Sequence, residues 1–170
     1  MIYFDNSATS RIKPPEVVMG VLGGLTKYSA NPGRAGHDLS LMTSIEVMGV
    51  REKIRSHVGA ESAENVIFTS NCSEALNYAI LGSAKRGGHI IITCNEHNSV
   101  YRPVEYLKKN YNVSYSVCQT DSNGIISAHE IEKLITPRTY LVVCNHISNV
   151  NGDMADIHAI GKLCFDRNIL

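Results

Sequence analysis

The sequence has no long apolar run and no excess of charge of either sign. No segment approaches the run of about 20 apolar residues that a membrane-spanning helix needs, so we expect no membrane association. The 16 basic and 16 acidic residues balance, and no basic patch is interleaved with aromatic residues, which excludes the usual pattern of a nucleic-acid-binding protein. The opening segment MIYFDNSATS lacks the basic and then apolar pattern of a secretion signal.

Paired cysteines and glycine-rich nucleotide motifs are also missing. The five cysteines are odd in number and have no tight framework spacing. They therefore predict reduced thiols and a cytoplasmic protein. Neither G-x-G-x-x-G nor the Gly-Lys-Ser/Thr of a P-loop is found, which excludes the commonest dinucleotide and nucleoside triphosphate sites.

The pattern of apolar segments predicts an α/β fold with a doubly wound, mostly parallel sheet. Runs such as 89–94 and 140–144 are almost continuously apolar, as in parallel strands that are covered on both faces. The expected strands are 65–69, 89–94, 112–118 and 139–145, and the expected helices are 14–28, 39–57, 73–86, 98–110, 127–135 and 155–166. A further strand begins near Asn168, so we expect a sheet truncated before its last strands. We place an N-terminal segment at 1–60 and a partial cofactor domain at 61–170.

The segment Phe68–Asn77, FTSNCSEALN, reads as a strand, a short polar turn and a helix start. This arrangement directs free backbone N–H groups and the positive end of a helix dipole at one point, which favours a phosphate. Small residues at 70–73 leave room for the phosphate to approach the backbone. The alternative is an ordinary capping box, in which Asn71 caps the helix and Glu74 returns the bond.

Two further candidate residues, His97 and Asn149, follow later strands of the expected sheet. Ligands bind beyond the carboxyl ends of the strands in such sheets, so we expect both residues near the phosphate turn. His97 suits stacking on a flat cofactor or moving a proton near neutral pH. The alternative for His97 is a histidine without a functional role, whose hydrogen bonds are satisfied within the protein. The alternative for Asn149 is a turn residue whose side-chain amide bonds its own backbone.

Zinc is a second chemistry to weigh, because Cys94, His97, Cys144 and His146 have suitable ligand types. Each Cys–His pair begins inside a strand, where successive side chains point to opposite faces, so the four are hard to bring together. We therefore expect no metal site. Cys94, Cys118 and Cys144 are expected to pack in the sheet as small apolar residues.

Five motifs occur in a fixed order along essentially all 170 residues. They are YFDNSAT at 3–9, NPGRAGH at 31–37, FTSNCSEALN at 68–77, EHNS at 96–99 and SNVNG at 148–152. This ordered set resembles the class V, fold-type I pyridoxal-phosphate enzymes, specifically the branch of cysteine desulfurases and selenocysteine lyases. The resemblance implies that the chain contains most of the large cofactor domain.

The resemblance also implies roles for individual residues. Cys72 and Ser73 match the pair that holds the phosphate of pyridoxal 5′-phosphate, and His97 matches the histidine that stacks on the pyridine ring and moves protons. Asn149 matches the asparagine near the ring oxygen of the cofactor. Asn6 and the loop at 34–37 match segments near the substrate and the dimer interface.

The chain departs from the family pattern in two ways. Asn71-Cys72-Ser73 stands where many relatives have Gly-Ala-Thr, although the Ser hydroxyl keeps a phosphate donor. The family's aspartate for the pyridine nitrogen, its Schiff-base lysine and its carboxylate-binding arginine match positions outside the chain. None of the four lysines from Lys85 to Lys133 follows the Ser/Gly-x-His-Lys pattern, so this chain alone is expected to be inactive.

The resemblance implies a homodimeric cysteine desulfurase that converts L-cysteine to L-alanine. The sulfur of L-cysteine becomes an enzyme persulfide on a cysteine outside this chain. It then passes to an acceptor protein for iron–sulfur or thio-cofactor assembly. One alternative is a related enzyme, such as a selenocysteine lyase or a class V aminotransferase. The other is a degenerate, non-catalytic short module that binds a partner.

Overall fold

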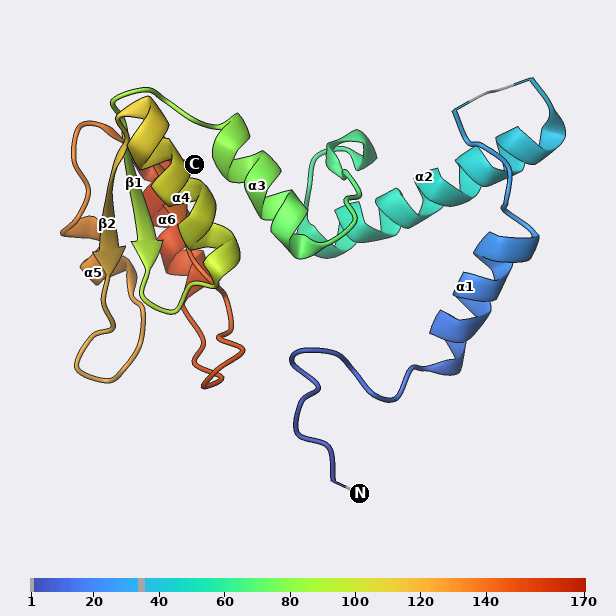
Figure 1. The fold of residues 1–170 in the computed structure, drawn as a ribbon, viewed down its shortest axis with the longest axis horizontal. Coiled ribbons are helices and arrows are strands. Elements are labelled where there is room, and N and C mark those ends of the chain that lie inside the picture. Colours follow the sequence, from blue (N-terminus) through green and yellow to red (C-terminus); the bar gives the residue numbers. More distant parts are fainter. Residues whose placement is uncertain (1, 34–35) are drawn as a thin grey trace. The chain divides into compact units, whose positions relative to one another are not determined.

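The chain divides after Phe68 into two units, Met1–Phe68 and Thr69–Leu170 (Figure 1). The structure is a computed structural model, and it describes residues 2–33 and 36–170. Within these two ranges, no helix has both the length and the apolar character that crossing a membrane requires.

The first unit contains the helices α1 (Pro15–Thr26) and α2 (Asp38–Val58) and the short 3-10 helix η1 (Ala63–Asn65). α1 begins at a proline, which is favoured in the first helical turn because its missing N–H would have no partner there. α2 ends at Gly59, whose φ of 72° is the left-handed conformation typical of glycine after a helix. Both predicted helices are confirmed, with ends shifted by two residues or fewer.

The strand expected at 65–69 is wrong. Asn65 is the last residue of η1, and residues 66–69 have no regular secondary structure. Ile67 and Phe68 are 76% and 51% exposed. A strand is stabilised by hydrogen bonds to a neighbouring strand, and none of the described residues forms such a ladder with this segment.

The second unit alternates helices and strands. In chain order it contains α3 (Cys72–Gly82), β1 (His89–Thr93), α4 (Asn98–Tyr111), β2 (Ser114–Cys118), α5 (Ala128–Glu132), β3 (Thr139–Val143) and α6 (Ile157–Asp166). Of the four strands expected in the chain, the three after 65–69 are therefore present, and so are all four helices expected in this unit. α3 and α5 end earlier than expected, at Gly82 and Glu132.

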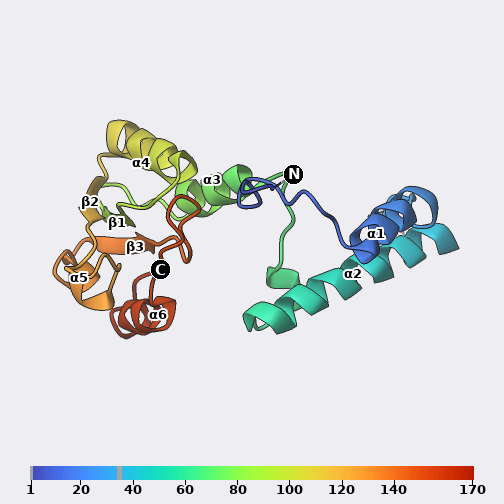
Figure 2. The same ribbon diagram turned by 90° about the horizontal axis from the view of Figure 1, so that it is seen from below.

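The three strands form one parallel sheet in the order β2-β1-β3. The chain moves from β1 to β2 on one side and then crosses to β3 on the other side of β1. The carboxyl ends of β1 and β3 therefore flank a topological switch point, where doubly wound sheets bind ligands. α4 covers one face of the sheet, and α5 and α6 cover the other (Figure 2).

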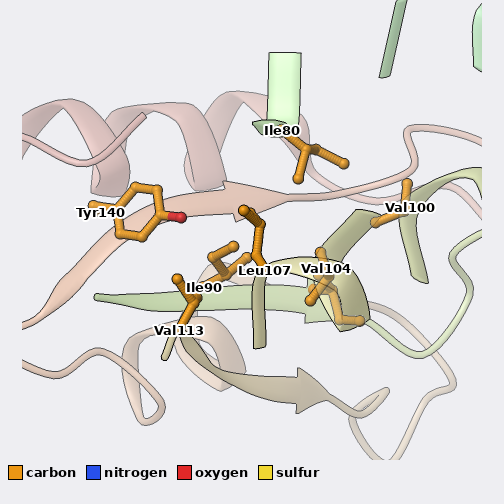
Figure 3. Close-up of a cluster of buried hydrophobic side chains, with 8 residues drawn as sticks. Ile80, Ile90, Val100, Val104, Leu107, Val113 and Tyr140 are labelled. Carbon is orange, nitrogen blue, oxygen red and sulfur yellow. The ribbon is translucent and has the colours of Figure 1, made fainter. Parts of the chain in front are cut away.

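The alternation of side chains along β1 fills both cores. Ile90 and Ile92 are fully buried against α3 and α4, with Val104 and Tyr140 among their neighbours (Figure 3). Ile91 is fully buried on the opposite face, in the cluster that contains residues of α5 and α6. A strand that is apolar on both faces must be covered on both faces, which explains the three layers of this unit.

The outer edge of β3 is paired with the last residue of the chain. The Leu170 N–H donates to the Tyr140 carbonyl at 3.0 Å, and the Leu170 carbonyl accepts from the Val142 N–H at 2.8 Å. Bonds to residues two apart on one neighbour are the pattern of a parallel strand pair. This pairing agrees with the strand that we expect to begin near Asn168.

Candidate functional site

A cavity of about 410 Å³ lies between the first turns of α3 and α4 in the second unit. It is lined by Ser73, Asn77, His97, Asn98, Ser99 and Arg102. Ser73 and His97, two of the residues proposed from the sequence, therefore share one cavity. Arg102 contributes a guanidinium group and the lining contains no acidic residue, so the cavity is suited to a ligand with negative charge.

The start of α3 leaves two backbone donors available. The Asn71 side chain accepts the Glu74 N–H at 2.9 Å, and the Glu74 carboxylate accepts the Ser70 N–H at 2.8 Å. The helix is therefore capped, as the alternative interpretation requires. The cap engages the backbone N–H of Glu74, the third residue of the helix. The backbone N–H groups of the first two residues, Cys72 and Ser73, have no acceptor among the described residues.

Free N–H groups at a helix start attract anions, because the dipole of the helix adds to their partial positive charge. The Glu74 carboxylate lies in the same turn, but it is already bonded by the Ser70 N–H and, at 2.8 Å, by the Tyr78 hydroxyl. These bonds lower the pKa of Glu74. Two amides and the Ser73 hydroxyl together form a donor set that fits a phosphate.

His97 is the N-cap residue of α4 and comes four residues after the end of β1. Its Nδ1 accepts the Ser99 N–H at 3.1 Å and lies 2.8 Å from the Ser99 hydroxyl. The ring is exposed. Because Nδ1 is engaged by the helix start, Nε2 is the ring nitrogen that remains available to a ligand.

The segment after β3 is joined to the segment after β1 by a buried carboxylate. Glu96 Oε1 accepts the Asn145 N–H at 2.6 Å and the Thr93 hydroxyl at 2.6 Å. Burial raises the pKa of Glu96, and these two hydrogen bonds act in the opposite direction. The bond between Glu96 and the Asn145 N–H holds the start of the amide-rich segment at 145–152 beside Glu96, which directly precedes His97.

Asn149 lies in the turn that follows, and its side chain is exposed. The turn is closed by the Ser148 N–H donating to the Asp153 carbonyl and by the Gly152 N–H donating to the Ser148 carbonyl, both at 2.9 Å. No side-chain hydrogen bond is formed by Asn149 with the described residues. Its amide is therefore available to a ligand.

Asn6 belongs to the first unit, where its Oδ1 accepts the Arg11 N–H at 3.2 Å. It lines a separate cavity with Tyr3, Arg11 and Ile12. Of the loop at 34–37, Arg34 and Ala35 lie outside the described residues. His37 is described, and its Nδ1 accepts the Ser40 N–H at 3.2 Å at the start of α2.

The cysteines of the second unit differ in burial. Cys118 and Cys164 are buried, Cys94 and Cys144 are half-buried, and Cys72 is exposed. Burial raises the pKa of Cys118 to about 11 and that of Cys144 to about 12, so both thiols stay protonated. No three His, Cys, Asp or Glu side chains gather at a metal-binding distance within residues 2–33 and 36–170.

Sequence reasoning did not assign a role to Asn77, Ser99 or Arg102. Asn77 lies one helical turn after Ser73, and its amide donates to the Ser73 carbonyl at 2.7 Å. Arg102 lies three residues after Ser99, so both project from the same face of α4. Asn77 lies four residues after the candidate Ser73, and this helical spacing is a local signal, but no spacing within one helix shows which helices meet.

Comparison with known proteins gives a consistent result over the whole chain. The family described as aminotransferase class-V matches residues 2–170. A probable cysteine desulfurase of Borreliella burgdorferi is 37% identical over 175 residues, which cover 99% of this chain and 41% of that protein.

Two solved structures have the same fold. The apo structure of a cysteine desulfurase from Thermococcus onnurineus NA1 has a TM-score of 0.88 at 33% identity, over 99% of this chain and 42% of that chain. The structure of SspA in complex with cysteine has a TM-score of 0.84 at 26% identity, over 98% of this chain and 48% of that one. The chain thus spans less than half the length of these relatives.

Proposed function

The chain belongs to the class V aminotransferase family, and from this membership we propose that it forms the phosphate-binding part of a pyridoxal-phosphate-dependent cysteine desulfurase. The observation that carries the proposal is the single cavity onto which the Ser73 hydroxyl and the His97 ring both open. We assign the cofactor-binding part to residues 61–170 and the N-terminal segment to residues 1–60.

The start of α3 would hold the phosphate. The amides of Cys72 and Ser73 and the Ser73 hydroxyl supply three donors, and the helix dipole adds a favourable field. Cys72 takes part through its backbone, so its thiol is not required. The side chain of Asn71 is used by the helix cap and does not compete for the phosphate.

His97 and Asn149 would hold the ring. The exposed imidazole of His97 offers its face for stacking and its Nε2 for holding a proton, while Nδ1 remains bonded to Ser99. The exposed amide of Asn149 offers an N–H donor for the ring oxygen. The Glu96 bond to the Asn145 N–H supports this pairing, since it joins the segments that carry the two residues.

When bound, pyridoxal phosphate supplies an electron sink that allows bonds of an amino-acid substrate to be broken. We propose L-cysteine as the substrate, which leaves as L-alanine while its sulfur adds to an enzyme thiol as a persulfide. Cys118 and Cys144 are unsuited to that thiol, because burial keeps them protonated. We place the persulfide cysteine and the cofactor-binding lysine in the part of the enzyme that corresponds to the rest of its relatives.

The same proposal includes a homodimer, a cytoplasmic location and a sulfur-acceptor protein in iron–sulfur or thio-cofactor assembly. Asn6 is proposed to contact the substrate. Since the Schiff-base lysine is not found in the expected pattern, residues 1–170 alone are proposed to bind the phosphate without turning over L-cysteine.

The test is an assay of the full-length protein with pyridoxal phosphate and L-cysteine. We expect visible absorbance of the bound cofactor, and alanine and sulfide in equal amounts when a reductant is present. Ser73→Ala and His97→Gln should each lower cofactor retention or turnover. The matched control is Ser127→Ala, which removes the cap of α5, where Ser127 Oγ accepts the Glu130 N–H at 3.4 Å.

Cofactor absorbance and sulfide release that stay unchanged in both Ser73→Ala and His97→Gln would refute the proposed roles of these residues. Elemental selenium from selenocysteine, with no reaction on cysteine, would instead indicate the selenocysteine lyase. Transfer of an amino group without sulfide would indicate an aminotransferase.

A further inference from the structure

A chain of two hydroxyl groups connects α3 to the ring of His97. The Ser73 and Ser99 hydroxyl oxygens are 2.6 Å apart, and the Ser99 hydroxyl oxygen is 2.8 Å from His97 Nδ1. Ser73 and Ser99 are 26 residues apart in the sequence. They meet because Ile80 of α3 packs with Val100 and Val104 of α4 in one buried cluster (Figure 3).

The backbone of Ser99 determines the direction of the hydrogen bonds. A backbone N–H can only donate, so the 3.1 Å contact from the Ser99 N–H requires His97 Nδ1 to accept. A neutral imidazole that accepts at Nδ1 carries its hydrogen at Nε2. The Ser99 hydroxyl, 2.8 Å away, is then the donor to Nδ1 and shares that atom's single lone pair with the Ser99 N–H, which leaves the hydroxyl oxygen free to accept the hydrogen of the Ser73 hydroxyl.

The surroundings make this arrangement specific to Ser99. It is half-buried, whereas Ser73 and His97 are exposed. Pro103 lies inside α4 and has no N–H to give to the carbonyl of Ser99 four residues earlier. The first turn of α4 is therefore held at His97, whose carbonyl accepts the Val100 N–H at 2.9 Å and whose Nδ1 accepts the Ser99 N–H at 3.1 Å.

We propose that Ser99 is a positioning residue, which fixes His97 in the tautomer with hydrogen on Nε2 and couples that ring to the phosphate donor Ser73. This inference rests on the proposed function, because it gives Ser99 a part in holding pyridoxal phosphate. Ser99 lines the same cavity, and in this role it acts through Ser73 and His97, the residues proposed to contact the cofactor.

The coupling has a direct consequence for phosphate binding. When the Ser73 hydroxyl turns its hydrogen toward a phosphate, the Ser99 oxygen loses the donor that it has in the free protein. The Ser99 hydroxyl retains its own hydrogen, which continues to hold Nδ1. Phosphate at the start of α3 therefore changes the hydrogen bonding at His97 without touching the ring.

Nitrogen NMR of the full-length protein, freed of cofactor and labelled with ¹⁵N-histidine, tests this proposal. In the wild type we expect His97 as a single tautomer with hydrogen on Nε2, and a change of its Nδ1 signal when inorganic phosphate is added. Ser99→Ala should shift the Nδ1 signal, abolish its response to phosphate, and raise the dissociation constant of pyridoxal phosphate about three- to ten-fold, as expected for one lost hydrogen bond.

Two variants separate positioning from folding. Ser99→Thr keeps the hydroxyl and should restore the wild-type Nδ1 signal and cofactor affinity. Ser127→Ala removes a helix-capping serine from α5, on the other face of the sheet, and should change neither quantity. An Nδ1 signal in Ser99→Ala that matches the wild type, both with and without phosphate, would overturn the proposal.

Failure of the proposed function gives a different result. If the wild-type protein does not bind pyridoxal phosphate, the desulfurase proposal fails. The tautomer of His97 and its dependence on the Ser99 hydroxyl are still read from the cofactor-free protein, so an Nδ1 signal that is unchanged in Ser99→Ala refutes only the role of Ser99.

Discussion

The Glu96 carboxylate accepts the backbone N–H of Asn145 at 2.6 Å, across 49 residues of sequence. Glu96 follows β1 and Asn145 follows β3, so the bond closes the switch point of the sheet at its carboxyl edge. The same oxygen accepts the Thr93 hydroxyl at 2.6 Å. One carboxylate oxygen thus fixes two segments, one leading to His97 and the other to Asn149.

Removal of this carboxylate should destabilise the second unit and loosen the site. We expect Glu96→Ala to lower the free energy of unfolding by about 1–3 kcal/mol, because the Asn145 amide and the Thr93 hydroxyl lose their acceptor. Glu96→Gln keeps an oxygen acceptor and should cost less. Urea unfolding of the full-length protein measures both, and equal stability of Glu96→Ala and wild type would show that water replaces the carboxylate.

The pH dependence of stability gives a second signature of Glu96. Burial raises the pKa of this group above its ordinary value of 4.5, so the folded protein holds the proton to higher pH than the unfolded chain. Its contribution to stability is therefore complete below pH 4.5 and is lost as the pH rises through the folded-state pKa. The stability of wild type minus that of Glu96→Gln should decrease over this range and then level off.

His89 should give the opposite slope. It is 4% exposed at the amino end of β1, where Nδ1 bonds the Thr139 hydroxyl at 2.8 Å and Nε2 bonds the Ser116 hydroxyl at 3.0 Å. Burial, and secondarily the charge of Arg138, lower the pKa of His89 below its ordinary value of 6.5. Its contribution to stability is present above pH 6.5 and is lost as the pH falls through the folded-state pKa.

We therefore expect His89→Gln to reduce the loss of stability on acidification below pH 6.5. At pH 8 the variant should be less stable by about 1–3 kcal/mol, since two half-buried hydroxyl groups lose their matched partner. The control is His158→Gln on the exposed surface of α6, which should leave the profile unchanged. An identical acid profile for His89→Gln and wild type would contradict the assignment.

The sequence predicts the second unit well, because its signals are local. The continuous apolar run of β1 and the alternation of Ile90, Ile91 and Ile92 between two cores follow from burial on both faces. The cap of α3 by Asn71 also follows from local spacing, and is observed at 2.9 Å. In these cases the residues that decide the structure are neighbours in sequence.

The errors concern features that depend on distant partners. Residues 66–69 have strand-like composition, but a strand exists only beside another strand. The contact between Ser73 and Ser99 depends on how α3 packs on α4, and no spacing within either helix reports it. The sequence shows Glu96 only as part of the EHNS motif, because its bond to Asn145 depends on the strand order β2-β1-β3.

The two-sided core predicts large and graded effects of truncation in β1. Ile91 is 0% exposed between the sheet and the α5–α6 layer. We expect Ile91→Val to cost about 0.5–1.5 kcal/mol and Ile91→Ala about 2–5 kcal/mol of unfolding free energy, because each step leaves a larger cavity. Ile125→Ala, at a position that is 44% exposed, should cost less than Ile91→Ala. Equal costs at the two positions would contradict the buried placement of Ile91.

The backbone role of Cys72 can be separated from its side chain by two substitutions. Cys72→Ala removes the thiol and keeps the amide, so cofactor affinity should stay within about two-fold of wild type, the margin for a lost surface contact. Cys72→Pro removes the amide N–H from the first helical position, where proline is tolerated. The extended backbone of Asn71, with φ −166° and ψ 168°, suits a residue that precedes proline.

We expect Cys72→Pro to retain the helix content of wild type and to raise the dissociation constant of pyridoxal phosphate roughly ten-fold or more, because a donor to a charged phosphate is lost. Circular dichroism and cofactor titration of the full-length protein measure the two quantities. Weak binding by Cys72→Ala would assign the role to the thiol instead. Wild-type affinity in Cys72→Pro, with the helix intact, would place the phosphate away from the start of α3.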